Sequence, residues 1–273
     1  MTGLGLLSLN QATVNRLGVP EAVGLCVRHE IPAIGLWREP VARAGLPAAA
    51  AAVRAAGLSV SSLCRGGFFT HADPAARAAA VADNKAAIAE AAALGTDTLV
   101  LVSGGLVPGS RDLGLARRMI ADAIAELVPV AQASGVRLGI EALHPVFAAD
   151  RCVITRLGEA LDLALAFPAD AVGVVVDTYH VWWDASVLSD IARAGERIVS
   201  YQVCDWILPL PADTLLGRGH VGDGHIDFPP ITAAVAAAGY TGPIEVEIFN
   251  EAIWAAPPDE TAETVRKRFP LAF

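Results

Sequence analysis

The residues that could do chemistry stand at the ends of short apolar runs in the second half of the chain. A run of mostly β-branched residues, Val-Gly-Val-Val-Val, ends at Asp177, and His180 follows three residues later. Similar runs carry Glu141, Gln202 and Glu247. An unpartnered buried carboxylate is very costly, and one metal ion would satisfy several at once. Two glutamates, an aspartate and an amide favour a hard ion, Mn²⁺ or Mg²⁺, with Co²⁺ or Zn²⁺ as further options.

Each of these residues also has a plainer interpretation. A carboxylate at a strand end often caps the next helix or pairs with an arginine, although few basic residues lie near these acids in the sequence. The run of Gln202 also offers Asp205. Glu245 points the same way along its strand as Glu247, so periodicity alone does not separate these two glutamates. His180 could equally cap a helix or lie in the core.

The elements that must position these residues alternate along the chain. Eight β-like runs are expected, at residues 3–9, 31–36, 58–63, 98–102, 137–142, 171–177, 198–204 and 244–249. Helix-like stretches separate them, at residues 20–30, 47–56, 74–94, 113–134, 156–167, 186–194 and 229–238. A doubly wound sheet is the alternative, but residues 10–13 lack the glycine motif of a dinucleotide-binding turn. The pattern predicts a single (β/α)₈ TIM barrel, whose strand ends converge on one face.

Length and composition restrict the possible functions. The chain has 273 residues with a net charge of −9, and no linker divides it, which predicts one domain over residues 1–273. An acidic protein binds nucleic acid poorly, because that affinity comes from basic residues that neutralise phosphates. No apolar run approaches the ~20 residues that span a membrane. Four cysteines without a CxxC pair, and an N-terminus without a basic signal region, predict reduced thiols in a cytoplasmic protein.

Several motifs together resemble the xylose-isomerase-like TIM-barrel superfamily. They are Gly-Ile-Glu at residues 139–141, Val-Asp-Thr-Tyr-His at 176–180, Gln-Val-Cys-Asp at 202–205, the glycine-rich segment 217–227, and the segment 242–250 with its Val-Glu-Ile-Phe pattern. This superfamily of sugar phosphate isomerases and epimerases includes ketose 3-epimerases, inosose isomerase and hydroxypyruvate isomerase. The resemblance covers nearly the whole chain and does not specify the substrate.

The resemblance implies a metal site and a catalytic pair. The metal ligands would be Glu141, Asp177, Gln202 and Glu247, with Glu247 preferred to Glu245 because it fits the Val-Glu-Ile-Phe pattern. Gln202 departs from the family, because many members have histidine there. Glu141 and Glu247 would also transfer the proton α to a carbonyl, one removing it and the other returning it, while the metal stabilises the enediolate.

The resemblance also implies which residues bind the substrate. His180 would hydrogen-bond a substrate oxygen, and Arg218 matches the family arginine that steers the substrate, although it could be a cation on a surface loop. His144 and Arg151 follow the fifth run and could line the pocket, or simply lie on the surface. The tryptophans after the strands, Trp37 and Trp182 among them, would stack on a sugar or pack in the core.

The function that follows is a metal-dependent isomerase or epimerase of a small keto-sugar, polyol-derived ketone or hydroxy-carbonyl compound, active in carbohydrate metabolism. No phosphate cradle is visible, so a non-phosphorylated substrate is expected, and the resemblance implies a homodimer or homotetramer. One alternative is a lyase on the same scaffold, such as a dehydratase or a C-glycoside-cleaving subunit. Another is a non-catalytic sugar-binding barrel. A DNA-repair endonuclease of this superfamily would need a histidine-rich zinc cluster, which these six scattered histidines do not predict.

Overall fold

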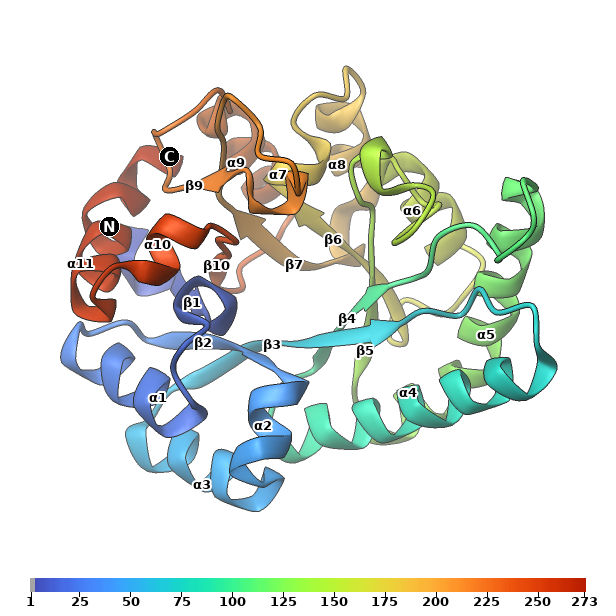
Figure 1. Ribbon diagram of the computed structural model, residues 1–273, viewed down its shortest axis with the longest axis horizontal. Coiled ribbons are helices and arrows are strands. Elements are labelled where there is room, and N and C mark those ends of the chain that lie inside the picture. The colour runs from blue at the N-terminus through green and yellow to red at the C-terminus, as the bar shows by residue number, and fades with distance from the viewer. Residues whose placement is uncertain (1–2) are drawn as a thin grey trace.

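The computed structural model describes residues 3–273, and its main strands form one closed parallel barrel (Figure 1). Around the barrel the strands follow the order β1-β10-β7-β6-β5-β4-β3-β2. They are β1 (Leu7–Asn10), β2 (Ala33–Trp37), β3 (Ser59–Gly67), β4 (Thr98–Val102), β5 (Arg137–Glu141), β6 (Val172–Asp177), β7 (Ile198–Val203) and β10 (Ile244–Val246). The predicted (β/α)₈ TIM barrel is therefore confirmed.

Helices surround the barrel on its outer side (Figure 1). The longer ones are α1 (Val19–Arg28), α2 (Arg38–Ala44), α3 (Leu46–Ala56), α4 (Pro74–Leu94), α5 (Leu113–Ser134), α6 (Leu157–Ala164), α8 (Val187–Ala194), α9 (Phe228–Ala237) and α11 (Pro258–Arg268). Short helices α7 (Thr178–Val181) and α10 (Glu251–Ala255) follow β6 and β10. The Asp73 side chain caps α4 by accepting from the Ala75 N–H, and Gly95 ends that helix in the left-handed conformation.

Three strands differ by three residues or more from a predicted bound, and pairing explains each case. Residues 3–6 form a 3₁₀ turn, and β1 begins only where Leu7 pairs with β10. The third strand runs four residues beyond the predicted 63, because β3 pairs with β4 as far as Gly67. The last strand stops at Val246, where its pairing with β7 ends. Arg65 therefore lies in a strand, and Glu247 lies just beyond one.

Two expectations on composition can be compared with the structure. All four cysteines are free and buried, as predicted. Among residues 3–273, no helix is long and apolar enough to cross a membrane.

A small antiparallel ribbon, β8 (Asp205–Trp206) with β9 (Arg218–Gly219), lies at the barrel mouth. The Asp205 carboxylate accepts hydrogen bonds from the backbone N–H groups of Gly222, Gly224 and Ile226, at 3.0, 2.8 and 3.0 Å. Asp205 therefore stabilises the glycine-rich segment that delivers Arg218 to the barrel mouth.

Candidate active site

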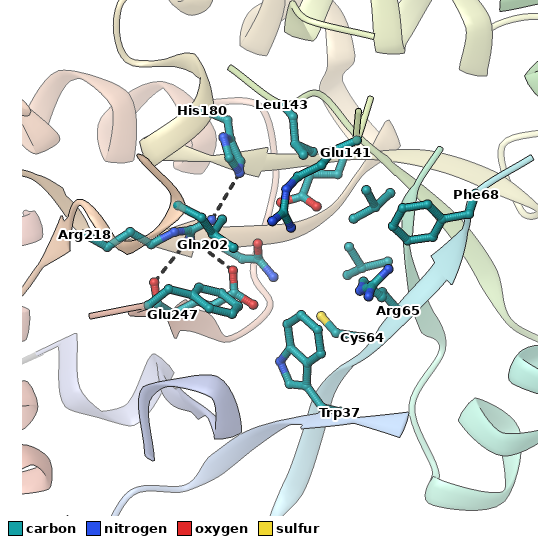
Figure 2. Close-up of a pocket in the computed structure, with 15 residues that line it drawn as sticks. Trp37, Cys64, Arg65, Phe68, Glu141, Leu143, His180, Gln202, Arg218 and Glu247 are labelled. Atoms are coloured by element: carbon teal, nitrogen blue, oxygen red, sulfur yellow. Dashed lines mark hydrogen bonds and ion pairs between the residues drawn. The ribbon is translucent and has the colours of Figure 1, made fainter. Parts of the chain in front are cut away.

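A cavity of about 180 Å³ opens at the carboxyl ends of the strands (Figure 2). It is lined by Trp37, Cys64, Arg65, Phe68, Val100, Val102, Glu141, Leu143, Arg151, His180, Gln202, Leu215, Arg218, Glu247 and Phe249. The fold thus brings together most of the predicted site residues, from strands far apart in the sequence. Asp177 lies beside this lining, in direct contact with Arg218.

Arg218 bridges two of the predicted metal ligands. Its side chain is only 2% exposed, and Nη1 donates to Asp177 Oδ2 at 3.0 Å and to Glu247 Oε2 at 3.1 Å. Its guanidinium carbon also lies 4.6 and 5.0 Å from the ring centres of Tyr179 and Phe249. The alternative of a surface-loop cation is therefore wrong.

Glu141 differs from these two acids, because its charge has no such partner. Within residues 3–273, no side chain donates a hydrogen bond to its carboxylate and no cation lies within ion-pair distance of it. Burial raises the pKa of Glu141 well above its ordinary value, and the charges of Asp177 and Glu247 raise it further. Burial also raises the pKa of Glu247 to about 8, although Arg218 opposes this shift. Both carboxyl groups therefore hold a proton more tightly than ordinary glutamates.

His180 lies in the same cavity, with 2% of its surface exposed. The backbone N–H of His144 donates to its Nδ1 at 3.1 Å, and Arg218 Nη2 lies 3.1 Å from its Nε2. A neutral imidazole accepts at one nitrogen only, so these two donors compete for one lone pair. Burial lowers the pKa of His180 well below its ordinary value, and Arg218 lowers it further, so the ring is neutral.

The Gln202 amide is oriented by a neighbouring glutamate. Its Nε2 donates to Glu245 Oε1 at 3.1 Å, whereas its Oε1 is buried and has no hydrogen-bond partner. A buried polar atom without a partner is rare, because it forfeits its hydration without compensation. The Oε1 atom is therefore available to accept a hydrogen bond or to contact a cation.

A hydrogen-bond network in turn fixes Glu245. Asn10 Nδ2 donates to Glu245 Oε1 at 2.5 Å, and the hydroxyls of Ser61 and Ser62 donate to Oε2. Asn10 Oδ1 accepts from Trp37 Nε1 at 2.8 Å, which connects the network to the cavity wall. Trp37, predicted to bind substrate, thus lines the cavity and also supports Glu245.

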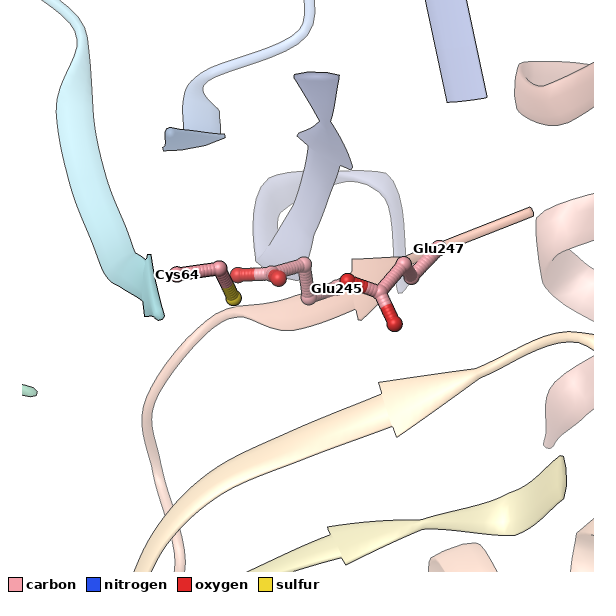
Figure 3. A group of neighbouring side chains, drawn as sticks. All are labelled: Cys64, Glu245 and Glu247. Atoms are coloured by element: carbon pink, nitrogen blue, oxygen red, sulfur yellow. The ribbon is translucent and has the colours of Figure 1, made fainter. Parts of the chain in front are cut away.

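The two glutamates of the last run have different surroundings. They lie close together, with oxygens of Glu245 and Glu247 within 4.8 Å of each other and of Cys64 Sγ (Figure 3). Glu245 is satisfied by its hydrogen bonds and does not line the cavity, whereas Glu247 does. Burial, with the nearby charges of Glu247 and Glu245, raises the pKa of Cys64 well above its ordinary value, so its sulfur is a protonated thiol and a poor metal ligand.

The residues at the cavity floor fit a divalent cation. Possible ligand atoms of Glu141, Asp177 and His180 lie within 4.8 Å of one another. When all three are deprotonated, the carboxylates of Glu141, Asp177 and Glu247 carry three formal negative charges and Arg218 one positive charge, which leaves two charges to be balanced. One divalent ion would balance them, and Gln202 Oε1 would supply an uncharged oxygen.

Two residues predicted to bind substrate do not line this cavity. The half-buried His144 ring packs against two tryptophans. Its ring centre lies 5.5 Å from that of Trp183 and 5.0 Å from that of Trp206. Trp182 also packs against Trp206, at 5.8 Å. His144 does act on the site indirectly, through its backbone contact with His180.

One charged lining residue was missed by the sequence analysis, and it is Arg65. The expected run ends at residue 63, before Arg65, and Gly66 and Gly67 follow. Strand pairing carries β3 through these glycines, which places Arg65 near a strand end and against the cavity.

The comparisons with known proteins agree with this geometry. The model of the xylose isomerase-like TIM barrel family matches residues 21–269. A crystal structure of protein SMc04130 from Sinorhizobium meliloti 1021 is 46% identical, covers 97% of this chain and 98% of its own, and superposes with a TM-score of 0.94. A crystal structure of the IOLI protein with a binding zinc atom shares the fold, with a TM-score of 0.84 at 20% identity over 97% of each chain.

Curated relatives match only part of their length. An inosose isomerase from Halalkalibacterium halodurans is 28% identical over 167 residues, which is 57% of each protein. A 3-dehydroshikimate dehydratase from Pseudomonas aeruginosa is 34% identical over 171 residues, which is 60% of this chain and 25% of the relative. The match thus spans little more than half of the first relative and a quarter of the second.

Proposed function

The chain belongs to the xylose isomerase-like TIM barrel family, and on this premise we propose that it is a divalent-metal-dependent isomerase or epimerase of a small hydroxy-carbonyl compound. One observation carries the proposal. Glu141 and Glu247, both with raised pKa values, line one cavity together with the unpartnered amide oxygen of Gln202. Related isomerases and structurally similar epimerases act on keto-sugars and inososes, which are compounds of this class.

The metal would be held by Glu141, Asp177, Gln202 and Glu247. Their oxygen donors favour Mn²⁺ or Mg²⁺, while the zinc in the IOLI protein supports a metal in this fold without fixing its identity. When bound, such an ion would polarise the substrate carbonyl and lower the energy of the enediolate. Arg218 would donate to a substrate oxygen while it keeps Asp177 and Glu247 in place.

The proton transfer itself would be performed by the two glutamates. One carboxylate removes the proton α to the carbonyl, and the other carboxyl group returns a proton to the neighbouring carbon or to the opposite face. General acid–base catalysis is most effective when the pKa lies near the working pH. Burial raises the pKa of Glu247 to about 8 in the metal-free protein, and a bound divalent ion would lower it. His180 would donate to a substrate hydroxyl from its neutral ring.

A dehydratase is the second candidate, favoured by the 34% identity to a 3-dehydroshikimate dehydratase. The same proton abstraction starts such a reaction, but a hydroxyl on the β carbon then leaves as water. The two candidates differ in product mass, because an isomer keeps the mass of the substrate and a dehydration product has lost water.

The direct test is turnover of a panel of keto-sugars, inososes and 3-dehydroshikimate, followed by mass spectrometry. The panel is measured with EDTA and after Mn²⁺ is added back. We expect activity that EDTA abolishes and Mn²⁺ restores. Activity that is indifferent to EDTA would refute the metal dependence, and a protein that binds these compounds without converting any would be a non-catalytic sugar-binding barrel.

A further inference from the structure

Arg65 presents a charge to the cavity that has no ion-pair partner among residues 3–273. It extends from β3, on the wall opposite Arg218 (Figure 2). In the part of the chain that the structure describes, its guanidinium has no hydrogen-bond acceptor and no carboxylate within 4 Å. Its closest recorded contacts are aromatic, with the Phe68 and Trp37 ring centres at 4.4 and 5.9 Å.

A second cation lines the same cavity. Arg151 follows β5, and its one ion-pair contact within residues 3–273 is a 3.7 Å approach of Nε to Asp150, whose side chain is 67% exposed. Such an exposed pair contributes little and leaves most of the guanidinium donors free. Burial lowers the pKa of Arg65, and the charge of Arg151 lowers it further, whereas the charges of nearby acids raise it. Arginine nevertheless stays protonated in proteins, so two positive charges line this cavity.

Two other arginines with low exposure are neutralised by acids, and the half-buried Arg77 and Arg197 donate to backbone carbonyls instead. Arg38, with a side chain 18% exposed, pairs with Asp83 and Glu90. Arg218 pairs with Asp177 and Glu247. Arg65 is half-buried as well, so its missing counter-ion sets it apart from both. Burial without a counter-ion is costly, which indicates that a ligand supplies the negative charge.

We propose that Arg65 and Arg151 form a subsite for an anionic group, a carboxylate or a phosphate, on the substrate. The planar guanidinium suits either group through paired charge-assisted hydrogen bonds. The anion would pair with these two guanidinium groups, so the substrate enters in one orientation, with its carbonyl and hydroxyl groups at the wall that holds Glu141 and Glu247. This inference rests on the proposed function only in that the substrate occupies this cavity.

Calorimetry with three cyclic polyols tests the subsite. The ligands are neutral myo-inositol, the carboxylate quinate and the phosphate ester inositol 1-phosphate, each titrated into Mn²⁺-treated protein and again in EDTA. We expect one of the two anions to bind more tightly than myo-inositol. Tighter binding of quinate would identify the anionic group as a carboxylate, and tighter binding of inositol 1-phosphate would identify it as a phosphate. In Arg65→Gln and Arg151→Gln that anion should bind about tenfold more weakly or worse, while myo-inositol binding stays unchanged. Arg54→Gln, at an exposed arginine of α3, is the matched control.

Several results would overturn the subsite. The first is that the wild-type protein binds myo-inositol as tightly as it binds both anions. The second is that it binds none of the three compounds. The third is that the affinity for the anion is unchanged in both arginine variants. Thermal unfolding of each variant identifies a folding defect, and either arginine variant alone suffices if the other fails to fold. The readout needs no turnover. If the protein prefers the anion to myo-inositol but shows no metal-dependent activity, the proposed function would be refuted and the anion subsite would stand.

Discussion

The two halves of the barrel mouth have opposite chemistry. Strands β5, β6, β7 and the end of β10 present buried acids and an amide, which are Glu141, Asp177, Gln202 and Glu247. Strands β2, β3 and β4 present an aromatic ring, a protonated thiol, a cation and apolar side chains, which are Trp37, Cys64, Arg65, Val100 and Val102. Under the proposed function, the acidic half would bind metal and transfer protons, while the other half would orient the substrate.

A second contrast lies within the acidic half itself. Glu245 and Glu247 are two residues apart and point the same way, yet Glu245 has its full set of hydrogen-bond donors and Glu247 faces the cavity. We therefore assign the first a positioning role, through Gln202, and the second a catalytic role. The following predictions test both contrasts.

The largest effect is expected from the catalytic pair. Glu141→Gln and Glu247→Gln remove the group that transfers the proton and should each lower kcat by about 10²–10⁴-fold. Initial rates on the substrate found by the panel would measure this loss. Glu263→Gln, the same change at an exposed position of α11, should keep the wild-type rate. Full turnover in both cavity variants would refute the catalytic assignment.

A smaller effect is expected at Glu245. Glu245→Gln weakens the acceptor that orients the Gln202 amide, and it should lower Mn²⁺ affinity by about 10- to 100-fold, as for other residues that orient a metal ligand. At saturating Mn²⁺ most of the rate should return, because Glu245 does not touch the substrate. A rate that stays low at saturating Mn²⁺ would contradict the positioning role and would make Glu245 a member of the catalytic set.

The smallest effect concerns pH. The pKa of Glu247 is about 8 in the folded protein against an ordinary 4.5, so between these values the folded state keeps a proton that the unfolded state has lost. In EDTA, the free energy of unfolding should therefore fall as pH rises from about 4.5 to about 8. Since a metal needs the deprotonated carboxylate, stabilisation by Mn²⁺ should be greater at pH 8 than at pH 6.

Thermal unfolding across this pH range, with and without Mn²⁺, measures both trends. In Glu247→Gln the fall in stability should be smaller, because one titrating group is gone, whereas Glu263→Gln should behave as the wild type does. An identical pH profile in wild type and Glu247→Gln would show that this carboxyl group has an ordinary pKa.

The sequence predicts the acidic half of the mouth better than the other half. Asp177 ends an uninterrupted apolar run, and such a run identifies both the strand and the end at which its polar residue emerges. Arg65 lies beside two glycines, which read locally as the end of a strand, and only pairing with β4 shows that the strand continues.

Two further features depend on contacts that no local pattern contains. Glu245 and Glu247 share a face by periodicity, and only the donors from Asn10, Ser61 and Ser62 distinguish them. Arg218 lies in a glycine-rich segment typical of a surface loop. Its burial requires the ribbon of β8 and β9 and the hydrogen bonds of Asp205 to the segment.

Mn²⁺ titration by calorimetry tests the central claim most directly, namely that the acidic half of the mouth binds one divalent ion. The account predicts one Mn²⁺ per wild-type chain, and affinity lowered by about 100-fold or more in Asp177→Asn and in Gln202→Leu. Gln202→His, which supplies an imidazole ligand instead, should retain binding. The account would be contradicted if the wild-type protein bound none of Mn²⁺, Mg²⁺, Co²⁺ and Zn²⁺. It would also be contradicted if Asp177→Asn and Gln202→Leu both bound Mn²⁺ with the wild-type affinity.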